Sequence, residues 1–106
     1  MAKIRAIVKR TDEPYGHMCN ISTTLENLQK IVEGYIESVT IRPGLLIICN
    51  EEGKIKGLDP NIRIPGDVIC GTIIVIGATG DELSDIPIEF AEWKQMLMSG
   101  KYLMGV

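Results

Sequence analysis

Cysteine, histidine and aromatic residues are scarce in this sequence. Its 106 residues include three cysteines, one histidine, one tryptophan, one phenylalanine and three tyrosines. An odd number of cysteines without paired spacing argues against a disulfide framework. A single histidine with scattered cysteines does not form a zinc ligand set. We therefore expect free cysteines, a largely aliphatic core, and neither a metal nor another cofactor.

Positive charge is also in short supply. The chain has 11 Lys and Arg residues against 14 Asp and Glu residues, which gives a formal net charge of −3. Proteins that neutralise nucleic-acid phosphates usually carry an excess of basic residues on one face. This balance argues against binding to duplex nucleic acid.

Long apolar runs are missing as well. The opening residues, MAKIRAIVKR, mix basic and apolar side chains, unlike a signal peptide. The longest apolar run, around Ile73 to Ile76, is far too short to span a bilayer. We expect no membrane partner and a cytoplasmic location, where cysteines stay reduced.

The sequence does contain short segments with strand or helix periodicity. Alternating or continuous apolar residues predict strands, and apolar residues three and four apart predict helices. The predicted strands are 3–9, Tyr35–Ile41, Leu45–Cys49, Lys54–Gly57 and Val68–Ile76, with a further short strand near Met18–Ile21. The predicted helices are Leu25–Glu33 and about 86–98. This order indicates one α+β domain over residues 1–106, with both helices packed on a mostly antiparallel sheet of about five strands.

The ends of these segments carry local signals. Thr23 and Glu26 form a capping-box pattern at the start of the first helix, and Gly34 is its expected stop. Asn50–Gly53 is predicted to turn the chain into a hairpin, with its glycine in the left-handed position. Residues 57–67 hold two Pro and two Gly, so we expect an exposed loop there.

No catalytic or phosphate-binding set emerges from the sequence. His17 and Cys19 are expected to point away from each other and not to pair as base and nucleophile. The loop Gly77–Glu82 follows a strand and precedes a helix, where glycine-rich loops can hold phosphate. It has no lysine and its two carboxylates would repel an anion, so we expect an ordinary connection.

Four short motifs mark the middle of the chain. They are G-Y-I-E at Gly34–Glu37, N-E-E-G-K at Asn50–Lys54, P-N at Pro60–Asn61 and D-x-I-x-G at Asp67–Gly71. Their order resembles that of a small family of uncharacterised proteins encoded by phages, prophages and plasmids, classified only as a domain of unknown function. The likeness runs from about residue 3 to 76, so the predicted helix at 86–98 lies outside it.

This resemblance implies a non-enzymatic accessory protein of a mobile element, located in the cytoplasm of a host bacterium. Small proteins of this kind often counter a host defence by binding a nucleotide immune signal or a defence protein such as a CRISPR effector. Polar groups suit contacts to base, phosphate or a basic protein surface, and an aromatic ring suits stacking. The expected binding residues are Tyr35, Asn50, Glu51, Glu52, Asn61 and Arg63.

Two other functions stay open. A small metal-dependent hydrolase would need Glu51, Glu52 and Asp67 to converge, because divalent cations favour several carboxylate ligands. A structural or assembly role is the other alternative. Exposed methionines near the C-terminus, among Met96, Met98 and Met104, would suit self-association into a homo-oligomer.

Overall fold

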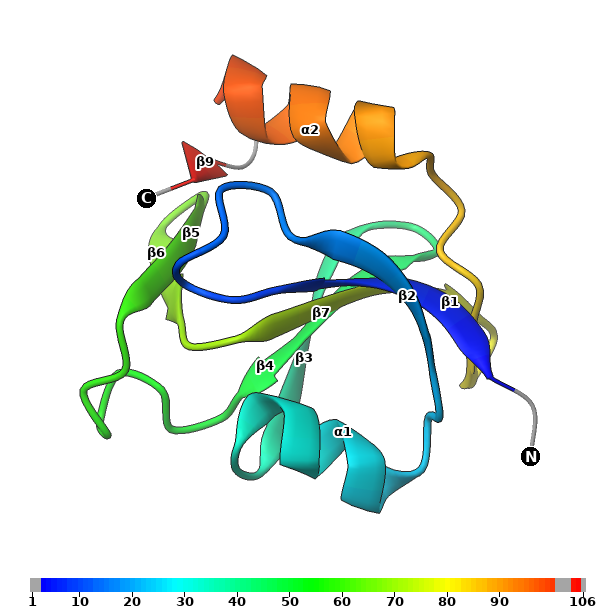
Figure 1. Ribbon diagram of the computed structural model, residues 1–106, viewed down its shortest axis with the longest axis horizontal. Helices are drawn as coiled ribbons and strands as arrows, with labels where there is room; N and C mark the ends of the chain where they lie inside the picture. The colour runs from blue at the N-terminus through cyan, green and yellow to red at the C-terminus, as the bar shows by residue number, and fades with distance from the viewer. Residues whose placement is uncertain (1–2, 101–103, 106) are drawn as a thin grey trace.

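The computed structural model describes residues 3–100 and 104–105 and shows the predicted α+β fold (Figure 1). Its helices are α1, Leu25–Val32, and α2, Phe90–Ser99. Its strands are β1 Ile4–Lys9, β2 His17–Ile21, β3 Ile36–Arg42, β4 Leu45–Asn50, β5 Pro60–Ile64, β6 Asp67–Cys70, β7 Ile73–Thr79, β8 Glu82–Ser84 and β9 Met104–Gly105. Within the described ranges, neither helix has the length and apolar character needed to cross a membrane.

The strands form two antiparallel sheets. The larger sheet has six strands in the order β2-β1-β7-β4-β3, with β8 pairing with the end of β7. The smaller sheet has the order β6-β5-β9. Figure 1 shows α1 and α2 on opposite sides of the larger sheet. The smaller sheet packs on the α2 side, because its buried residues share a cluster with those of α2.

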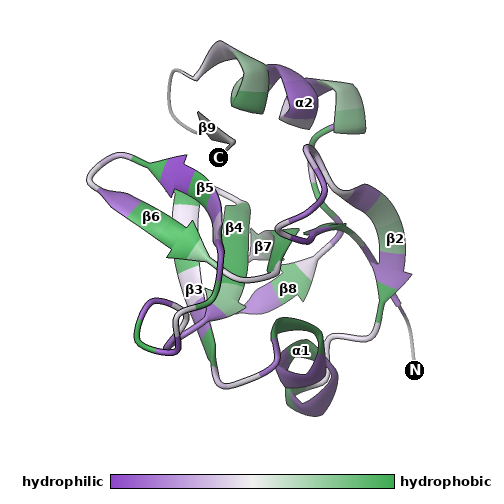
Figure 2. Cartoon of the chain, turned by 60° about the vertical axis from the view of Figure 1, so that its left-hand side comes forward, coloured by the Kyte–Doolittle hydropathy of each residue, from purple (hydrophilic) through white to green (hydrophobic). Residues whose placement is uncertain are grey.

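Each face of the larger sheet covers its own core, since side chains alternate along a strand. On β7, Ile73 and Val75 belong to the core on the α2 side, and Ile74 and Ile76 belong to the core on the α1 side. All four are fully buried. The other central strand, β4, which is mostly hydrophobic in Figure 2, lies between β7 and β3 and is almost entirely buried, which confirms the prediction for Leu45–Cys49.

α1 begins at Leu25 as predicted and ends one residue before the predicted Glu33, and its cap residues differ from the prediction. Thr24, and not Thr23, is the N-cap residue, and its side-chain hydroxyl accepts a 3.2 Å hydrogen bond from the backbone N–H of Asn27. At the other end Glu33 adopts the left-handed conformation, with φ of 64°. Gly34 serves a different need, because a Cβ there would come within 2.5 Å of the Asn50 amide nitrogen.

The segment after β4 is not the predicted hairpin. Lys54–Gly57 forms no strand, and backbone hydrogen bonds within residues 50–58 close successive turns instead. The physical reason is that β4 already pairs with β3 on one side and β7 on the other, so no edge is free for a returning strand. The left-handed glycine is Gly57, with φ of 70°, and not Gly53. A Cβ at Gly53 would meet the Cys70 carbonyl oxygen at 2.6 Å.

A hairpin of β5 and β6 replaces most of the exposed loop expected at 57–67. Asn61 and Ile62 in β5 are fully buried. Pro60 is the first residue of its strand and Gly66 lies between the strands with φ of 80°. Both positions are compatible with strand pairing, so composition alone gave a wrong prediction here.

The predicted strand Val68–Ile76 is two strands that belong to different sheets. β6 ends at Cys70, and β7 begins at Ile73. Between them Gly71 has φ of 88°, in the left-handed region that glycine tolerates. The apolar run continues through this change of sheet, so its pattern does not reveal the break.

The chain between β7 and α2 is more extended than predicted. Gly77–Glu82 is part of the β7–β8 hairpin and does not lead into a helix. The second helix begins at Phe90 and not near residue 86, because the Ile86 N–H donates to the Arg5 carbonyl oxygen at 2.9 Å and holds this segment against β1. Gly100 ends α2 as predicted, with φ of 64°.

Candidate functional site

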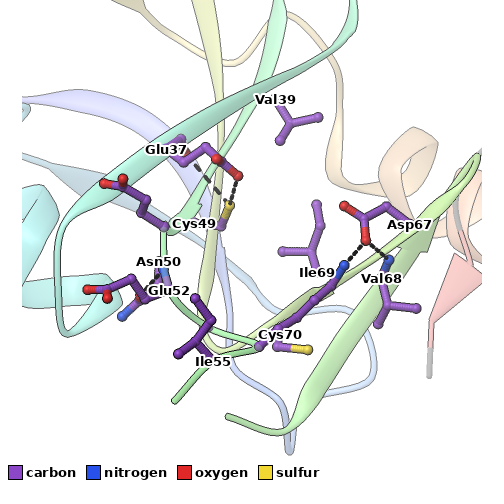
Figure 3. A pocket seen from close by; sticks show the side chains of 13 residues that line it. Glu37, Val39, Cys49, Asn50, Glu52, Ile55, Asp67, Val68, Ile69 and Cys70 are labelled. Carbon is purple, nitrogen blue, oxygen red and sulfur yellow. Dashed lines mark hydrogen bonds and ion pairs between the residues drawn. The ribbon is translucent and has the colours of Figure 1, made fainter. Parts of the chain in front are cut away.

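A groove lies between two sheet edges, β3 of the larger sheet and β6 of the smaller one (Figure 3). We call it the β3–β6 groove, and its cavity volume is about 220 Å³. β3 and β4 form one wall, β6 forms the other, and the turns after β4 close one end. Its lining residues are Glu37, Val39, Cys49–Ile55 and Asp67–Cys70.

Acidic side chains outnumber basic ones in the β3–β6 groove. Glu37, Glu51 and Asp67 are exposed and Glu52 is half-buried. Lys54 is the one basic residue of the lining, and its ammonium is hydrogen-bonded to the Asp67 carboxylate. That bond raises the pKa of Lys54 and lowers the pKa of Asp67, so both are charged at neutral pH. The excess of carboxylates makes the groove negative.

Cys49 lies in the wall of the groove as a neutral thiol. Its side chain is 3% exposed, and its Sγ donates to the Glu37 carbonyl oxygen at 3.7 Å. Burial, reinforced by the carboxylates of Glu37 and Asp67, raises the pKa of the Cys49 thiol to about 11. Since the thiolate is the nucleophilic form, this cysteine is not activated at neutral pH.

Asn50, one of the predicted binding residues, has its amide engaged inside the protein. Its Nδ2 donates to the carbonyl oxygens of Val32 and Glu33 at 3.1 and 3.3 Å. Its Oδ1 accepts from the Glu52 N–H at 2.8 Å. Asn50 therefore closes the C-terminal end of α1 and orders the turn after β4.

Asn61, another predicted binding residue, connects the two sheets. It is fully buried, and its Nδ2 donates to the carbonyl oxygens of Lys9 and Gly71 at 2.8 Å each. Its Oδ1 accepts from the Lys9 ammonium, which is itself buried, and burial lowers the pKa of Lys9. These contacts use the amide, so a ligand contact by Asn61 stays a prediction that the geometry does not favour.

The other predicted binding residues lie at three places. Glu51 and Glu52 line the β3–β6 groove, and Glu52 Oε1 lies 3.9 Å from Lys56 Nζ. Tyr35 is 66% exposed and immediately precedes β3, outside the lining of the groove. Arg63 is exposed on β5 and lines an adjoining hollow beside the β5–β6 turn, which shares Lys54, Asp67 and Val68 with the groove. The structure thus brings together Asn50, Glu51 and Glu52, and leaves the other three apart.

Sequence reasoning did not assign Glu37 or Lys54 to a site, and it considered Asp67 only as a metal ligand. Glu37 pairs with Cys49 in a register set by a bulge between Thr40 and Arg42, which nothing in the sequence marks. Asp67 reaches the groove because β6 belongs to the second sheet. Both placements depend on pairing between segments distant in the chain.

The acidic residues do not form a metal site. Among the residues that the structure describes, no three His, Cys, Asp or Glu side chains are placed to hold a metal ion. The hypothesis of a metal-dependent hydrolase requires Glu51, Glu52 and Asp67 to converge. The geometry therefore gives that hypothesis no support.

His17 and Cys19 lie on β2, where residues two apart share a face. The expectation that they point away from each other was therefore wrong. The His17 ring is engaged elsewhere, with its Nδ1 2.9 Å from the Glu13 carboxylate, and burial, the largest cause, raises the pKa of Cys19. A protonated thiol beside an imidazole that is hydrogen-bonded to Glu13 is not an activated nucleophile.

A second hollow of about 700 Å³ lies between the β1–β2 turn and α1. Its cationic residues are Arg10 and Lys30, and the imidazole of His17 also lines it. Two carboxylates, Asp12 and Glu33, also line it. The hollow is therefore larger and less acidic than the β3–β6 groove.

The methionines of the C-terminal region differ in their exposure to solvent. Met98 is 62% exposed on α2 and Met96 packs against the core on the α2 side. The side chain of Met104 lies outside the described part of the chain. Self-association through such a patch stays a prediction.

Comparison with known families identifies the chain at the family level. The model of one family, described as a domain of unknown function (DUF3846), matches residues 4–98. The chain belongs to this family. The DUF3846 match includes most of α2, so it extends beyond the segment 3–76 to which the sequence likeness was traced. No curated protein and no solved structure matches the chain.

Proposed function

We propose that this DUF3846 protein is a non-enzymatic binding protein of a mobile element, active in the cytoplasm of a host bacterium. In this proposal it counters a bacterial defence by occluding one of the defence proteins. The observation that carries the proposal is the β3–β6 groove, in which exposed carboxylates outnumber the single lysine. Such a surface is complementary to a basic protein surface.

Defence proteins that hold nucleic acid offer a surface of this kind. RNA-guided effectors hold their heteroduplex in a positively charged channel. A net charge of −3 is too small for the whole chain to imitate nucleic acid, so the contact would be local, centred on Glu37, Glu51 and Glu52. Opposite charges at such a rim mainly raise the association rate and fix the partner.

A phage-plating assay tests this proposal. In bacteria that carry a nucleic-acid-targeting CRISPR effector, the unaltered protein is expected to restore plating of a targeted phage. A Glu51→Lys/Glu52→Lys variant should lose this effect, because it reverses the charge of the groove. An Asp81→Lys/Glu82→Lys variant is the matched control, since it changes the charge equally at the distant β7–β8 turn. Full activity of the groove variant would contradict the proposal.

A nucleotide immune signal is the second candidate ligand, and the hollow beside α1 is the observation that favours it. Phosphates would be repelled by the acidic groove, whereas Arg10 and Lys30 offer cationic partners in a volume of about 700 Å³. The test is to incubate the protein with cyclic nucleotides, remove the excess, denature it by heat and analyse what is released. Intact nucleotide that is lost in an Arg10→Ala/Lys30→Ala variant supports sequestration, and an altered product indicates an enzyme.

A further inference from the structure

The edge of β3 exposes backbone groups that could pair with another strand. β3 is the last strand of the larger sheet and pairs, within the described residues, with β4 alone. The Glu51 N–H donates to the Tyr35 carbonyl oxygen at 2.8 Å. Tyr35 and Glu51 are therefore a hydrogen-bonded pair of the antiparallel ladder, as opposed to a non-hydrogen-bonded pair. Since such pairs alternate in an antiparallel ladder, the N–H and C=O groups of Ile36, Ser38 and Thr40 point away from β4.

This edge is open to solvent over a short length. Ser38 and Thr40 are exposed, and a bulge between Thr40 and Arg42 ends the regular stretch. Natural sheets usually protect such an edge with charged side chains, proline, a bulge or a covering segment, and here Glu37 and the bulge limit the free edge to the short stretch Ile36–Thr40. The stretch Ile36–Thr40 reads IESVT and contains neither proline nor lysine.

The acidic groove lies along the same edge. Glu37 and Val39 of β3 line the β3–β6 groove, so their side chains occupy the face that the groove shares. A strand added beside β3 would place every second side chain on that face, next to Glu37 and across from Asp67. Lysine or arginine side chains at those positions would meet carboxylates.

We propose that the partner docks by β-strand addition. An extended segment of another protein pairs antiparallel with Ile36–Thr40 and places its basic side chains over the β3–β6 groove. Main-chain hydrogen bonds to Ser38 and Thr40 hold the segment, and the carboxylates of the groove select its charge. This inference rests on the proposed function, because it specifies how a basic partner would bind the acidic groove.

A second copy of this chain fits the edge less well. Antiparallel pairing of β3 with its own copy would place two acidic grooves on one face of a continuous sheet. Like charges brought together in this way oppose association. The charge of the groove therefore favours a basic partner over self-pairing.

Synthetic peptides provide the test on the unaltered protein. The probe is an acetylated octapeptide of alternating lysine and valine, with a glutamate–valine peptide as the charge control. In the proposed geometry the lysine side chains face the groove and the valine N–H groups point at β3. N-methylation of the valines should therefore weaken binding about tenfold or more, and N-methylation of the lysines should leave it nearly unchanged. Isothermal titration calorimetry gives both affinities.

A variant pair tests the same contact from the protein side. Ser38→Pro removes an N–H that β4 does not use, so the variant should fold and lose peptide binding by a similar factor. Ser38→Ala keeps the N–H and should bind like the unaltered protein. If Ser38→Pro fails to fold, the methylated peptides still decide the question.

The outcomes separate the two proposals. Tight binding of the lysine–valine peptide that survives valine methylation would overturn strand addition but leave the acidic docking surface in place. Equal binding of the glutamate–valine peptide would overturn both. Strand addition by a basic partner would also be overturned if backbone N-methylation at the lysines weakened binding more than N-methylation at the valines. A dimer in analytical ultracentrifugation that Ser38→Pro dissolves would overturn it as well.

Discussion

At the scale of single residues, the motifs that carry the family resemblance are mostly internal contacts. Gly34 of the first motif leaves room for the side chain of Asn50 of the second, which closes α1. Asn61 of the third donates to the carbonyl oxygen of Gly71 of the fourth. Gly53 is likewise required by close backbone approach. The glycines and asparagines of the four motifs therefore hold distant segments together, whereas the exposed carboxylates of the same motifs are left for binding.

The Asn61 amide gives a prediction at this scale. Asn61→Ala would remove the side-chain acceptor of the buried Lys9 ammonium, which would keep only its 3.4 Å bond to the backbone carbonyl oxygen of residue 61, and would remove the donor to two buried carbonyl oxygens. We expect a loss of about 3 kcal/mol in the free energy of unfolding, since unsatisfied buried polar groups are costly. Urea denaturation followed by circular dichroism measures it. The control is Asn20→Ala at an exposed position of β2, which should change stability by less than about 0.5 kcal/mol; similar effects of the two substitutions would contradict the structural role of Asn61.

At the scale of elements, α1 is short and depends on side chains at both ends. It has 8 residues, too few for an isolated helix to be stable in water. Thr24 satisfies a free N–H at its start, and Asn50 satisfies two carbonyl oxygens at its end. Leu28 and Val32 bury its inner face against the larger sheet.

The position of the N-cap can be tested with two neighbouring threonines. Thr24→Ala removes the observed capping bond and should cost about 1 kcal/mol of stability. Thr23→Ala is the matched control, because Thr23 would be the cap only if the sequence pattern were correct. Thermal unfolding of both variants measures the difference. A larger loss for Thr23→Ala would restore the capping box with Glu26.

At the scale of the whole molecule, the two cores share their strands. Neighbouring residues of β4, Ile47 and Ile48, belong to the cores on the α2 and α1 sides respectively. The same holds for Ile74 and Val75 in β7. Because adjacent residues of one backbone serve both cores, neither core can dissolve without loosening the other.

One cooperative unfolding transition is therefore expected. Trp93 is the single tryptophan, is fully buried in α2, and donates through Nε1 to the Tyr15 carbonyl oxygen at 2.9 Å. Its fluorescence should shift at the same urea concentration at which circular dichroism reports loss of the sheet. Trp93→Phe, which keeps most of the apolar contact, should lower stability by about 1 kcal/mol or more through the lost hydrogen bond. A fluorescence transition that clearly precedes the loss of the sheet would show that the α2 layer unfolds separately.

The elements that could be predicted from the sequence are those whose apolar pattern stays within a single strand or helix. Strand β1 was found from its alternation, β4 from its continuous apolar run, and the apolar stripe of α2, with Trp93 and Leu97, from its helical spacing. The failures share a different cause. Residues 57–76 change from one sheet to the other at Gly71, and a run of apolar residues is the same whichever sheet receives it. For the candidate site, Glu51 and Glu52 were among the predicted binding residues and line the groove, whereas Glu37 was not predicted and Asp67 was considered only as a metal ligand.

The sequence by itself determined the α+β class, the aliphatic core, the acidic balance and the free state of the cysteines that the structure describes. These follow from composition and short-range periodicity, which act within a few residues. Only the tertiary structure decided that Asn50 and Asn61 are internal, that β3 is an open edge, and that Glu37 and Asp67 face one groove. The reason is that these properties depend on which strands pair and in which register, and long-range pairing places residues from separate sheets side by side without marking either of them in the sequence.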